Sequence, residues 1–423
     1  MPGLFGTSGV RKKVEELTDE FAKDLGRALG TCVSTDVAVG RDTRRTGPRL
    51  EKAFVDGLLS AGRNVVKVGL VPTPTVGVAT AELGTGVVVT ASHNPPEYNG
   101  FKFFNREGAF RPDLEKEVDE AFGSKKFRTG RGMAGERDYV QKHVNIIVKR
   151  VGEADGVNVL VDCAGGAGSV VTPFVLGAMG CEATVINDNR DGIFPHPLEP
   201  TDKNLEATCK AVAKAGVDIG FAHDGDADRA CAIGGDGRLV EWDTFLTVLA
   251  SQADKVVTTV DASMRIEEFC KRVYRVAVGD VAVAEGIRKH KAGFGGEPSG
   301  TYIFPDIHVF PDGVATVAKA AKLVADGVFY DLVEEIPSYP MERVKIPCHA
   351  HEKERIMENL KKILKGVEYS DVDGIRITYD DGWVLLRPSG TEDFVRITAE
   401  AKTKDRLDDI VKNGKEWIKK ARQ

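Results

Sequence analysis

The sequence has few of the features that mark nucleic-acid-binding, membrane or secreted proteins. Its 58 lysines and arginines are outnumbered by 64 aspartates and glutamates, and the net charge of −6 gives no basic field for nucleic acid or an anionic membrane. No apolar run approaches transmembrane length, and the first residues lack the charged-then-apolar pattern of a signal peptide. We therefore expect a cytoplasmic protein that binds neither nucleic acid nor a membrane.

Cysteine is also scarce, and its spacing excludes two classes of small fold. The seven cysteines are odd in number and widely scattered, and no CxxC occurs. This pattern excludes a zinc knuckle and a disulfide framework, and it fits a reducing cytosol. No segment of the sequence has a pattern typical of a subunit interface, so the sequence leaves the oligomeric state open.

What is present is the composition of a large globular protein. A chain of 423 residues is too long for one ordinary core, and 42% hydrophobic with 29% charged residues is typical of globular domains. Short β-branched runs alternate with helical patterns through most of the chain, whereas the last part combines several strands with two helices, one of them expected over residues 351–364. A further helix is expected over residues 263–272. We predict three similar mixed α/β domains and a smaller α+β domain, with boundaries 1–140, 141–235, 236–335 and 336–423.

The stretch from Thr90 to Lys102 begins where the apolar run at residues 86–90 ends. This pattern predicts a buried strand that gives way to a loop, fixed by two prolines and turned back at Asn99–Gly100. A serine at such a strand end, here Ser92, is most often a turn or cap residue. A serine hydrolase would need a sharp G-x-S-x-G turn and a remote histidine. The histidine here is the adjacent His93, which we do not expect to reach back over Ser92.

Three carboxylates, Asp224, Asp226 and Asp228, follow the apolar strand predicted at residues 218–222. Each like-charge pair at close range costs about 3–4 kcal/mol at an effective dielectric of about 20, and a bound divalent cation removes that cost. All-oxygen ligands favour Mg²⁺ or Ca²⁺ over zinc, but the spacing does not match an EF-hand. A solvated acidic turn is the alternative, although the apolar strand before the cluster favours a site.

Two later loops carry groups that suit a sugar phosphate. In residues 295–300, Glu297 and Ser299 stand two apart in a Gly/Pro loop and can bind vicinal hydroxyls, although an ordinary turn has the same composition. In residues 387–392, an arginine, two hydroxyls and a glycine suit a phosphate because guanidinium and backbone N–H groups both donate to its oxygens. An ordinary hairpin turn explains this second loop equally well.

Taken together, five segments resemble the motifs of the α-D-phosphohexomutases, in the family's order and over essentially the whole chain. They are FGTSGVR (5–11), TASHNPPEYNGFK (90–102), DGDADR (224–229), GEPSG (296–300) and RPSGTE (387–392). The sequence departs from the family in three places. Ala227 stands where glycine is commoner, Thr301 where a histidine often follows the sugar loop, and Asp393 where proline is usual. The missing histidine leaves the general base unassigned, and nothing in the sequence gives that role to His308.

The resemblance implies a role for each matching residue. Ser92 carries the exchanged phosphoryl group with Arg11 facing it, and the three aspartates hold one Mg²⁺ together with the phosphate on Ser92. Either Lys102 or His93 assists proton transfer. The implied substrate-binding residues are Arg229, Glu297, Ser299, Arg387, Ser389, Gly390, Thr391 and Arg396.

The implied reaction is the interconversion of hexose 6-phosphates and hexose 1-phosphates through phosphoserine and a bisphosphate intermediate. A phosphatase would need only the serine and the cation, whereas a mutase also needs a separate anion site, which here is the loop at residues 387–392. We expect four loops to face one central cleft, with the fourth domain opening and closing over it. Gly279-Asp280 and the EPSG form favour glucosamine phosphate as the substrate. Mannose and glucose phosphates are the alternative, and a non-catalytic sugar-phosphate binding protein is a more distant one.

Overall fold

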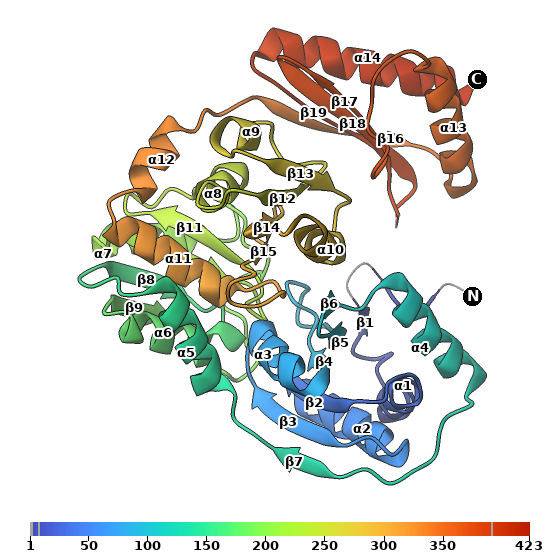
Figure 1. Cartoon of the computed structure of the whole chain (residues 1–423), viewed down its shortest axis with the longest axis vertical. Coiled ribbons are helices and arrows are strands. Elements are labelled where there is room, and N and C mark those ends of the chain that lie inside the picture. Colours follow the sequence, from blue (N-terminus) through green and yellow to red (C-terminus); the bar gives the residue numbers. More distant parts are fainter. Residues whose placement is uncertain (1–2, 7–8, 391) are drawn as a thin grey trace.

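A computed structural model describes residues 3–6, 9–390 and 392–423 of the protein. Four sheets follow one another along the chain, one in each of four units. Figure 1 shows the first three units packed together and the fourth joined to them by one connection after α12. The predicted fold class, three mixed α/β units followed by a smaller α+β unit, is confirmed. No helix in the described part of the chain is both long enough and apolar enough to cross a membrane.

The first unit is built on a seven-stranded mixed sheet with the order β1-β5-β4-β2-β3-β7, and β6 pairs with β5. Strands β2, β3, β4 and β7 run parallel, whereas β5 and β1 are antiparallel to their neighbours. Thr18 caps α1 by accepting a hydrogen bond from the Phe21 amide, as the Ser/Thr-acid pattern predicts. The strands are β1 (Val10–Lys13), β2 (Asp36–Arg41), β3 (Val65–Leu70), β4 (Gly84–Val89), β5 (Tyr98–Asn105), β6 (Gly108–Ala109) and β7 (Ala134–Glu136). The helices are α1 (Asp19–Cys32), α2 (Gly47–Ser60), α3 (Thr73–Leu83) and α4 (Pro112–Ser124).

The second and third units share one plan and one apolar core. Each sheet has three parallel strands and one antiparallel edge strand, in the orders β11-β10-β8-β9 and β13-β12-β14-β15. A single cluster of buried apolar side chains runs through both units. The second unit contains α5 (Val140–Val151), β8 (Asn158–Asp162), η1 (Ala167–Val170), α6 (Thr172–Ala178), β9 (Glu182–Ile186), α7 (Glu206–Ala215), β10 (Ile219–His223) and β11 (Ala230–Gly234). The third contains α8 (Trp242–Ala250), β12 (Val256–Thr259), α9 (Ile266–Phe269), β13 (Val273–Val276), α10 (Asp280–His290), β14 (Phe294–Gly296), β15 (Tyr302–Ile303), α11 (Gly313–Ala325) and α12 (Phe329–Glu335).

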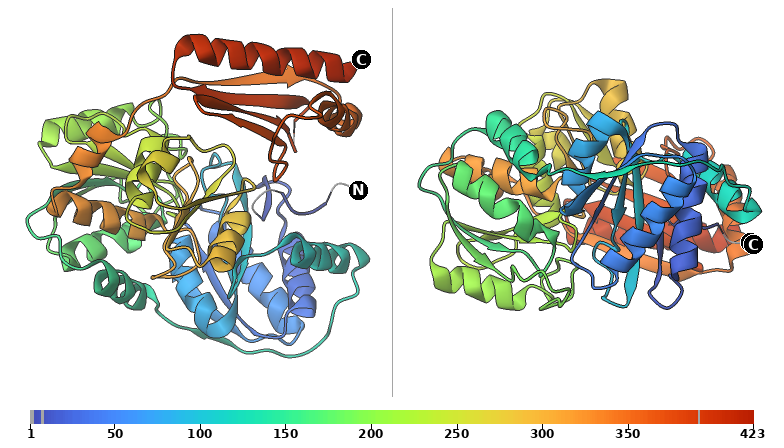
Figure 2. Two further views of the ribbon diagram at one scale, coloured as in Figure 1. Left: turned by 45° about the horizontal axis from the view of Figure 1, so that its top comes forward. Right: turned by 90° about the horizontal axis from the view of Figure 1, so that it is seen from below.

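The fourth unit is an antiparallel sheet, in the order β16-β19-β18-β17, with a core of its own. Figure 2 shows α14 and α13 on this sheet, with the unit standing beside the other three. Its elements are β16 (Met341–Pro347), η2 (Ala350–Glu352), α13 (Lys353–Ile363), β17 (Ile375–Tyr379), β18 (Gly382–Pro388), β19 (Phe394–Ala401) and α14 (Lys404–Arg422).

Two local predictions were wrong. Asn99–Gly100 is not a turn: both residues lie in β5, and the chain reverses earlier, between Val89 and Tyr98. The helix predicted over residues 263–272 is only the single turn Ile266–Phe269. The carbonyls of Ala262 and Ser263 accept hydrogen bonds from the Arg275 guanidinium, and this interaction takes up acceptors that a longer helix would use.

Candidate active site

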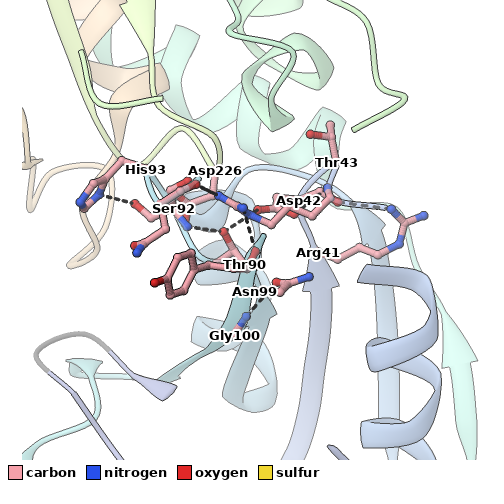
Figure 3. Close-up of polar contacts among 12 residues, drawn as sticks. Arg41, Asp42, Thr43, Thr90, Ser92, His93, Asn99, Gly100 and Asp226 are labelled. Atoms are coloured by element: carbon pink, nitrogen blue, oxygen red, sulfur yellow. Dashed lines mark hydrogen bonds and ion pairs between the residues drawn. The ribbon is translucent and has the colours of Figure 1, made fainter. Parts of the chain in front are cut away.

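Ser92 lies just after β4, in a backbone conformation that strains a non-glycine residue. Its φ is +50°, in the left-handed region. The side chain is 1% exposed, and its Oγ donates a hydrogen bond to Asp224 Oδ2 at 2.7 Å. The Ser92 amide donates to Thr90 Oγ1 at 2.8 Å (Figure 3). Strain held by surrounding structure is typical of functional sites, and here it aims the hydroxyl at the aspartate loop.

The arginine that holds this strained loop was not identified as a site residue from the sequence. The fully buried guanidinium of Arg44 donates to four carbonyls of the loop, at 2.6–2.9 Å. Asp42 orients Arg44 through Nε at 3.1 Å and also accepts the Thr90 hydroxyl proton at 2.7 Å. The only signal in the sequence is the stretch RDTR at residues 41–44, which begins at the last residue of strand β2. Its carbonyl partners lie about fifty residues away, so their distance could not be predicted.

The three aspartates form one buried cluster between β10 and β11. Their oxygens lie within 4.8 Å of one another, and the side chains of Asp224, Asp226 and Asp228 are 0%, 0% and 9% exposed. A solvated acidic turn is therefore excluded. Oδ1 of Asp226 and Oδ1 of Asp228 are buried without a hydrogen-bond partner among the described residues. Buried carboxylate oxygens that lie close together and lack hydrogen-bond partners are suitable ligands for a hard divalent cation. These three residues therefore suit a metal site.

The aspartate loop packs directly against the serine loop. A Cβ added to Gly225 would lie 2.7 Å from the Ser92 carbonyl oxygen, so a glycine is needed for this approach. Ala227, where the family more often has glycine, has φ +52° and therefore adopts the conformation that glycine tolerates best. The two segments, far apart in sequence, thus meet at one point.

Cations surround the cluster. Lys102, on β5, donates to Asp226 Oδ2 at 2.7 Å and also bonds Asp228. Burial opposes the charge of Lys102, but these aspartates hold its pKa above the ordinary value. Arg11 donates to Asn94 Oδ1 at 2.9 Å, and burial lowers its pKa even though the aspartates act in the opposite sense. Arg229 is held above its ordinary pKa by the neighbouring carboxylates, although burial again opposes.

The pKa values of Asp224 and Asp226 are shifted in opposite directions. Burial, reinforced by the other two carboxylates, raises the pKa of Asp224 well above its ordinary value. Burial would raise the pKa of Asp226 as well, but the charge and hydrogen bond of Lys102 and the Thr73 hydroxyl hold it below its ordinary value. Lys102 forms an ion pair with Asp226, whereas no described lysine, arginine or histidine forms one with Asp224.

His93 does reach back toward Ser92, contrary to the prediction. Its Nδ1 lies 3.4 Å from Ser92 Oγ (Figure 3). The left-handed turn at Ser92 brings the two adjacent side chains to the same side, which an extended backbone would not do. Burial and the nearby cations lower the pKa of His93 to about 3, so the ring is neutral.

The sugar loop faces a cavity of about 210 Å³ that also reaches Arg11, Lys102 and Asp228. Glu297, Ser299 and Thr301 all line this cavity, and burial, with the charge of Asp280, raises the pKa of Glu297 to about 7. His308 does not line it. Its Nε2 lies 2.9 Å from Asp312, which also contacts His143 at 3.0 Å.

The fourth-unit loop stands apart from the cavity, and none of the described residues that line the cavity belongs to that unit. Arg387 is oriented by Asp373 at 2.8 Å, and Asp373 also accepts the Val278 amide at 3.0 Å, which links the loop to the cavity wall. Gly390 is exposed, and Thr391 lies outside the described residues. Ser389 Oγ accepts the Glu392 amide at 3.1 Å, Arg396 pairs in register with Arg387, and Asp393 lies 3.9 Å from Lys353.

Sequence profiles of the phosphoglucomutase/phosphomannomutase family match the chain in four successive segments. Its α/β/α domains I, II and III match residues 2–129, 137–237 and 243–339, and its C-terminal domain matches residues 344–413. A probable phosphoglucosamine mutase of Methanobrevibacter smithii is 42% identical, over 94% of each chain. A phosphoglucosamine mutase of Methanococcus maripaludis is 40% identical, over 98% of each.

Solved structures share the fold. A phosphoglucomutase/phosphomannomutase family protein from Burkholderia thailandensis superposes with a TM-score of 0.90 at 28% identity, over 99% of this chain and 97% of that one. An N-acetylphosphoglucosamine mutase of Aspergillus fumigatus, solved with GlcNAc-6P and magnesium, has a TM-score of 0.63 at 15% identity over 99% and 96%. The chain belongs to the phosphoglucomutase/phosphomannomutase family, the α-D-phosphohexomutases, and is an enzyme of the mutase class.

Proposed function

We propose that the enzyme interconverts glucosamine 6-phosphate and glucosamine 1-phosphate in the cytoplasm, with Ser92 as the phosphoryl carrier. One observation carries the proposal: Ser92 Oγ lies 2.7 Å from Asp224 in a buried three-carboxylate cluster, and another member of that cluster, Asp228, lines a cavity together with Glu297. The relatives about 40% identical over nearly the full chain are named for glucosamine phosphate, which supports the choice of sugar.

The reaction transfers a phosphoryl group twice. The P–O bond to Ser92 Oγ breaks as a bond forms to the free hydroxyl of the hexosamine monophosphate, and the proton that this hydroxyl loses ends on Ser92 Oγ. The resulting bisphosphate turns round without leaving, and its other phosphoryl group returns to Ser92. His93 Nδ1, 3.4 Å from Ser92 Oγ, is our candidate to exchange a proton with that oxygen, and Lys102 is the alternative.

The remaining residues stabilise or position the transferred group. Arg11, Lys102 and Arg229 place positive charge around the equatorial oxygens, because phosphoryl transfer depends mainly on electrostatic stabilisation. Asp224, Asp226 and Asp228, with a phosphate oxygen on Ser92, would hold Mg²⁺. Such an ion neutralises charge that builds up on the phosphoryl oxygens when it is bound.

The far end of the substrate is assigned to the other two loops. Glu297 and Ser299 would bind the sugar hydroxyls. Arg387, Ser389, Gly390, Thr391 and Arg396 would bind the phosphate that is not being exchanged. This second anion site is what separates a mutase from a phosphatase, because the sugar must be held while it presents either end to Ser92.

Intact-mass measurement and a substrate panel test the proposal together. Purified wild-type protein should carry one phosphoryl group, which is discharged during incubation with glucosamine 6-phosphate. Ser92→Ala should carry none and lose mutase turnover, whereas the exposed Ser124→Ala should behave as wild type. Full turnover by Ser92→Ala would refute the covalent role.

The same panel decides the sugar. We expect kcat/KM to be highest for glucosamine phosphate, and higher values for mannose or glucose phosphates would replace our choice with the alternative. Binding of sugar phosphates without any turnover would identify a non-catalytic binding protein instead.

A further inference from the structure

Two carboxylates of the cavity have no part in the chemistry described so far. Glu115, in the first turn of α4, and Asp280, the first residue of α10, both line the cavity of about 210 Å³. They come from the first and third units, and the cavity lies between those units (Figure 1 shows α4 and α10). The cavity also holds cations suited to phosphate, so these two acids must serve a different part of the ligand.

Neither carboxylate has a cationic partner. Among the described residues, no lysine, arginine or histidine nitrogen forms an ion pair with Glu115 or Asp280. Burial raises the pKa of Glu115 to about 7, and the charge of Asp280 is the second cause. Burial also raises the pKa of Asp280, although Lys102 acts in the opposite sense. Two half-buried carboxylates that repel each other at the wall of a substrate cavity favour a ligand that brings its own positive charge.

The position of Asp280 is fixed by a hydrogen bond from the preceding residue to the proposed sugar-binding loop at residues 295–300. Gly279 has φ +129°, a conformation that glycine tolerates, and its amide donates to Glu297 Oε1 at 2.7 Å. The preceding amide, of Val278, donates to Asp373 Oδ2 at 3.0 Å. The turn that carries Asp280 is therefore bound on one side to the sugar loop and on the other to the residue that orients Arg387.

We propose that Asp280, together with Glu115, binds the protonated 2-amino group of a hexosamine phosphate and thereby selects amino sugars over neutral hexose phosphates. The inference rests on the proposed mutase function. An ammonium group donates charge-assisted hydrogen bonds to both carboxylates and offsets their repulsion. The 2-hydroxyl of glucose or mannose phosphate offers one donor and no charge, so it leaves the acids uncompensated.

The test compares two substrates that differ at this position. Steady-state kinetics with glucosamine 1-phosphate and glucose 1-phosphate would be measured for the wild-type full chain, Asp280→Asn and Glu115→Gln. For Asp280→Asn we expect kcat/KM on glucosamine 1-phosphate to fall by about 10- to 100-fold, the size of a lost hydrogen bond to a charged group. The value on glucose 1-phosphate should stay within about threefold of wild type. Asp280→Glu, which keeps the charge, should retain part of the preference.

A matched control separates recognition from helix stability. An acid in the first turn also stabilises a helix through its dipole, so the loss of either acid could weaken the fold. Asp113 is another first-turn acid of α4, but it is exposed and does not line the cavity. Asp113→Asn should leave the ratio of kcat/KM between the two substrates unchanged.

Three results would count against the proposal. If Asp280→Asn lowered kcat/KM equally for glucosamine 1-phosphate and glucose 1-phosphate, Asp280 would only shape the cavity. If the ratio of kcat/KM between the two substrates were unchanged in both Asp280→Asn and Glu115→Gln, ammonium recognition would be excluded. Calorimetric titration with glucosamine 6-phosphate and glucose 6-phosphate tests the same point without turnover, and equal affinity of Asp280→Asn and wild type for glucosamine 6-phosphate would overturn it. Failure of the mutase proposal looks different: wild type would carry no phosphate on Ser92 and turn over no hexose phosphate.

Discussion

At the scale of single residues, the conformation of the Ser92 loop depends on a neighbour, Arg44, that does not line the cavity. Arg44 is 2% exposed and donates to four carbonyls of the Ser92 loop, while Asp42 holds its Nε. A planar guanidinium can reach several acceptors at once, whereas an ammonium is a single point of charge. The left-handed turn at Ser92 is therefore held by a residue 48 positions away, and positioning of the hydroxyl should depend on it.

Replacing Arg44 should damage stability and turnover together. In Arg44→Met the buried Asp42 loses its partner, and breaking a buried pair in this way costs about 3–5 kcal/mol in the free energy of unfolding. Arg44→Lys keeps the charge but cannot form the fork of hydrogen bonds, so we expect an intermediate stability with kcat reduced more than KM is raised. Urea unfolding and steady-state kinetics would measure both quantities.

The control is Arg45→Lys. The Nε of the neighbouring Arg45 donates to the Asp191 carbonyl at an exposed position. Wild-type stability and kcat in Arg44→Met would contradict the positioning role.

The sequence predicted the residue types of the candidate site better than their geometry. It placed Ser92, the three aspartates and Glu297 in loops after strands, because short apolar runs that end in turn-forming residues can be recognised in the sequence alone. It did not predict that Arg44 would bind the serine loop, because that contact joins segments that only the fold brings together. It also misplaced His93, since the left-handed φ at Ser92 leaves no mark in the composition of the loop.

At the scale of elements, the third and fourth units are joined by a buried carboxylate. Glu400, on β19, accepts hydrogen bonds from the Ser263 hydroxyl, the Met264 amide at 2.7 Å and the Trp383 indole at 2.7 Å. Asp243, on α8, accepts the Ser263 amide at 2.7 Å in the same joint. Burial raises the pKa of Asp243 to about 7, with Glu400 and Glu241 adding to the effect and Arg265 opposing it.

This joint predicts a pH dependence of stability. The pKa of Asp243 is higher in the folded state than the unfolded value of about 3.9, so its contribution to stability is full below about pH 4 and is lost as the pH rises through 7. Asp243→Asn keeps the acceptor for the Ser263 amide but has no charge. It should therefore match wild type near pH 4 and exceed it at pH 8, by on the order of 4 kcal/mol in the free energy of unfolding.

Urea unfolding at pH 4, 6 and 8 would measure this difference. The exposed Asp331→Asn, on α12, should show no such trend. A difference between Asp243→Asn and wild type that stayed constant over this range would show that the Asp243 carboxyl is not neutral in the folded protein.

The helix α1, which is apolar on one face only, was easier to predict than the helix α3, which is buried over most of its length. In α1 the apolar residues recur on one face after a Ser/Thr cap, which is a pattern that the sequence itself displays. The helix α3 lies between the first sheet and the second unit and is buried over most of its length, so it has no polar face to reveal a helical period. The shortened α9 shows a third case, because a side chain from β13, Arg275, takes the carbonyls that would have extended it.

At the scale of the whole molecule, the fourth unit contacts the cavity wall through Asp373 and Val278 but does not itself line the cavity, as far as the described residues show. Arg387 is oriented by Asp373, yet no described residue of this unit lines the catalytic cavity. Figure 2 shows the unit beside the other three, reached by one connection after α12. Because the proposed mechanism needs the second phosphate held while the first is transferred, the unit must move toward the cavity when substrate binds.

Closure should be visible in solution as a change of overall size. We expect the radius of gyration from small-angle X-ray scattering to fall when saturating glucosamine 6-phosphate is added to Ser92→Ala, which binds substrate but cannot turn it over. The double variant Ser92→Ala/Arg387→Gln should show little closure of the fourth unit, because glutamine keeps a polar side chain but lacks the charge that binds phosphate.

In the otherwise wild-type enzyme, Arg387→Gln should raise KM by about 10- to 100-fold. Half-buried Arg406, which pairs with Asp381 on the far end of the sheet, provides the control variant Arg406→Gln. A radius of gyration unchanged by substrate would mean that the second phosphate is held in the open form, and the turning of the bisphosphate would then need no domain motion.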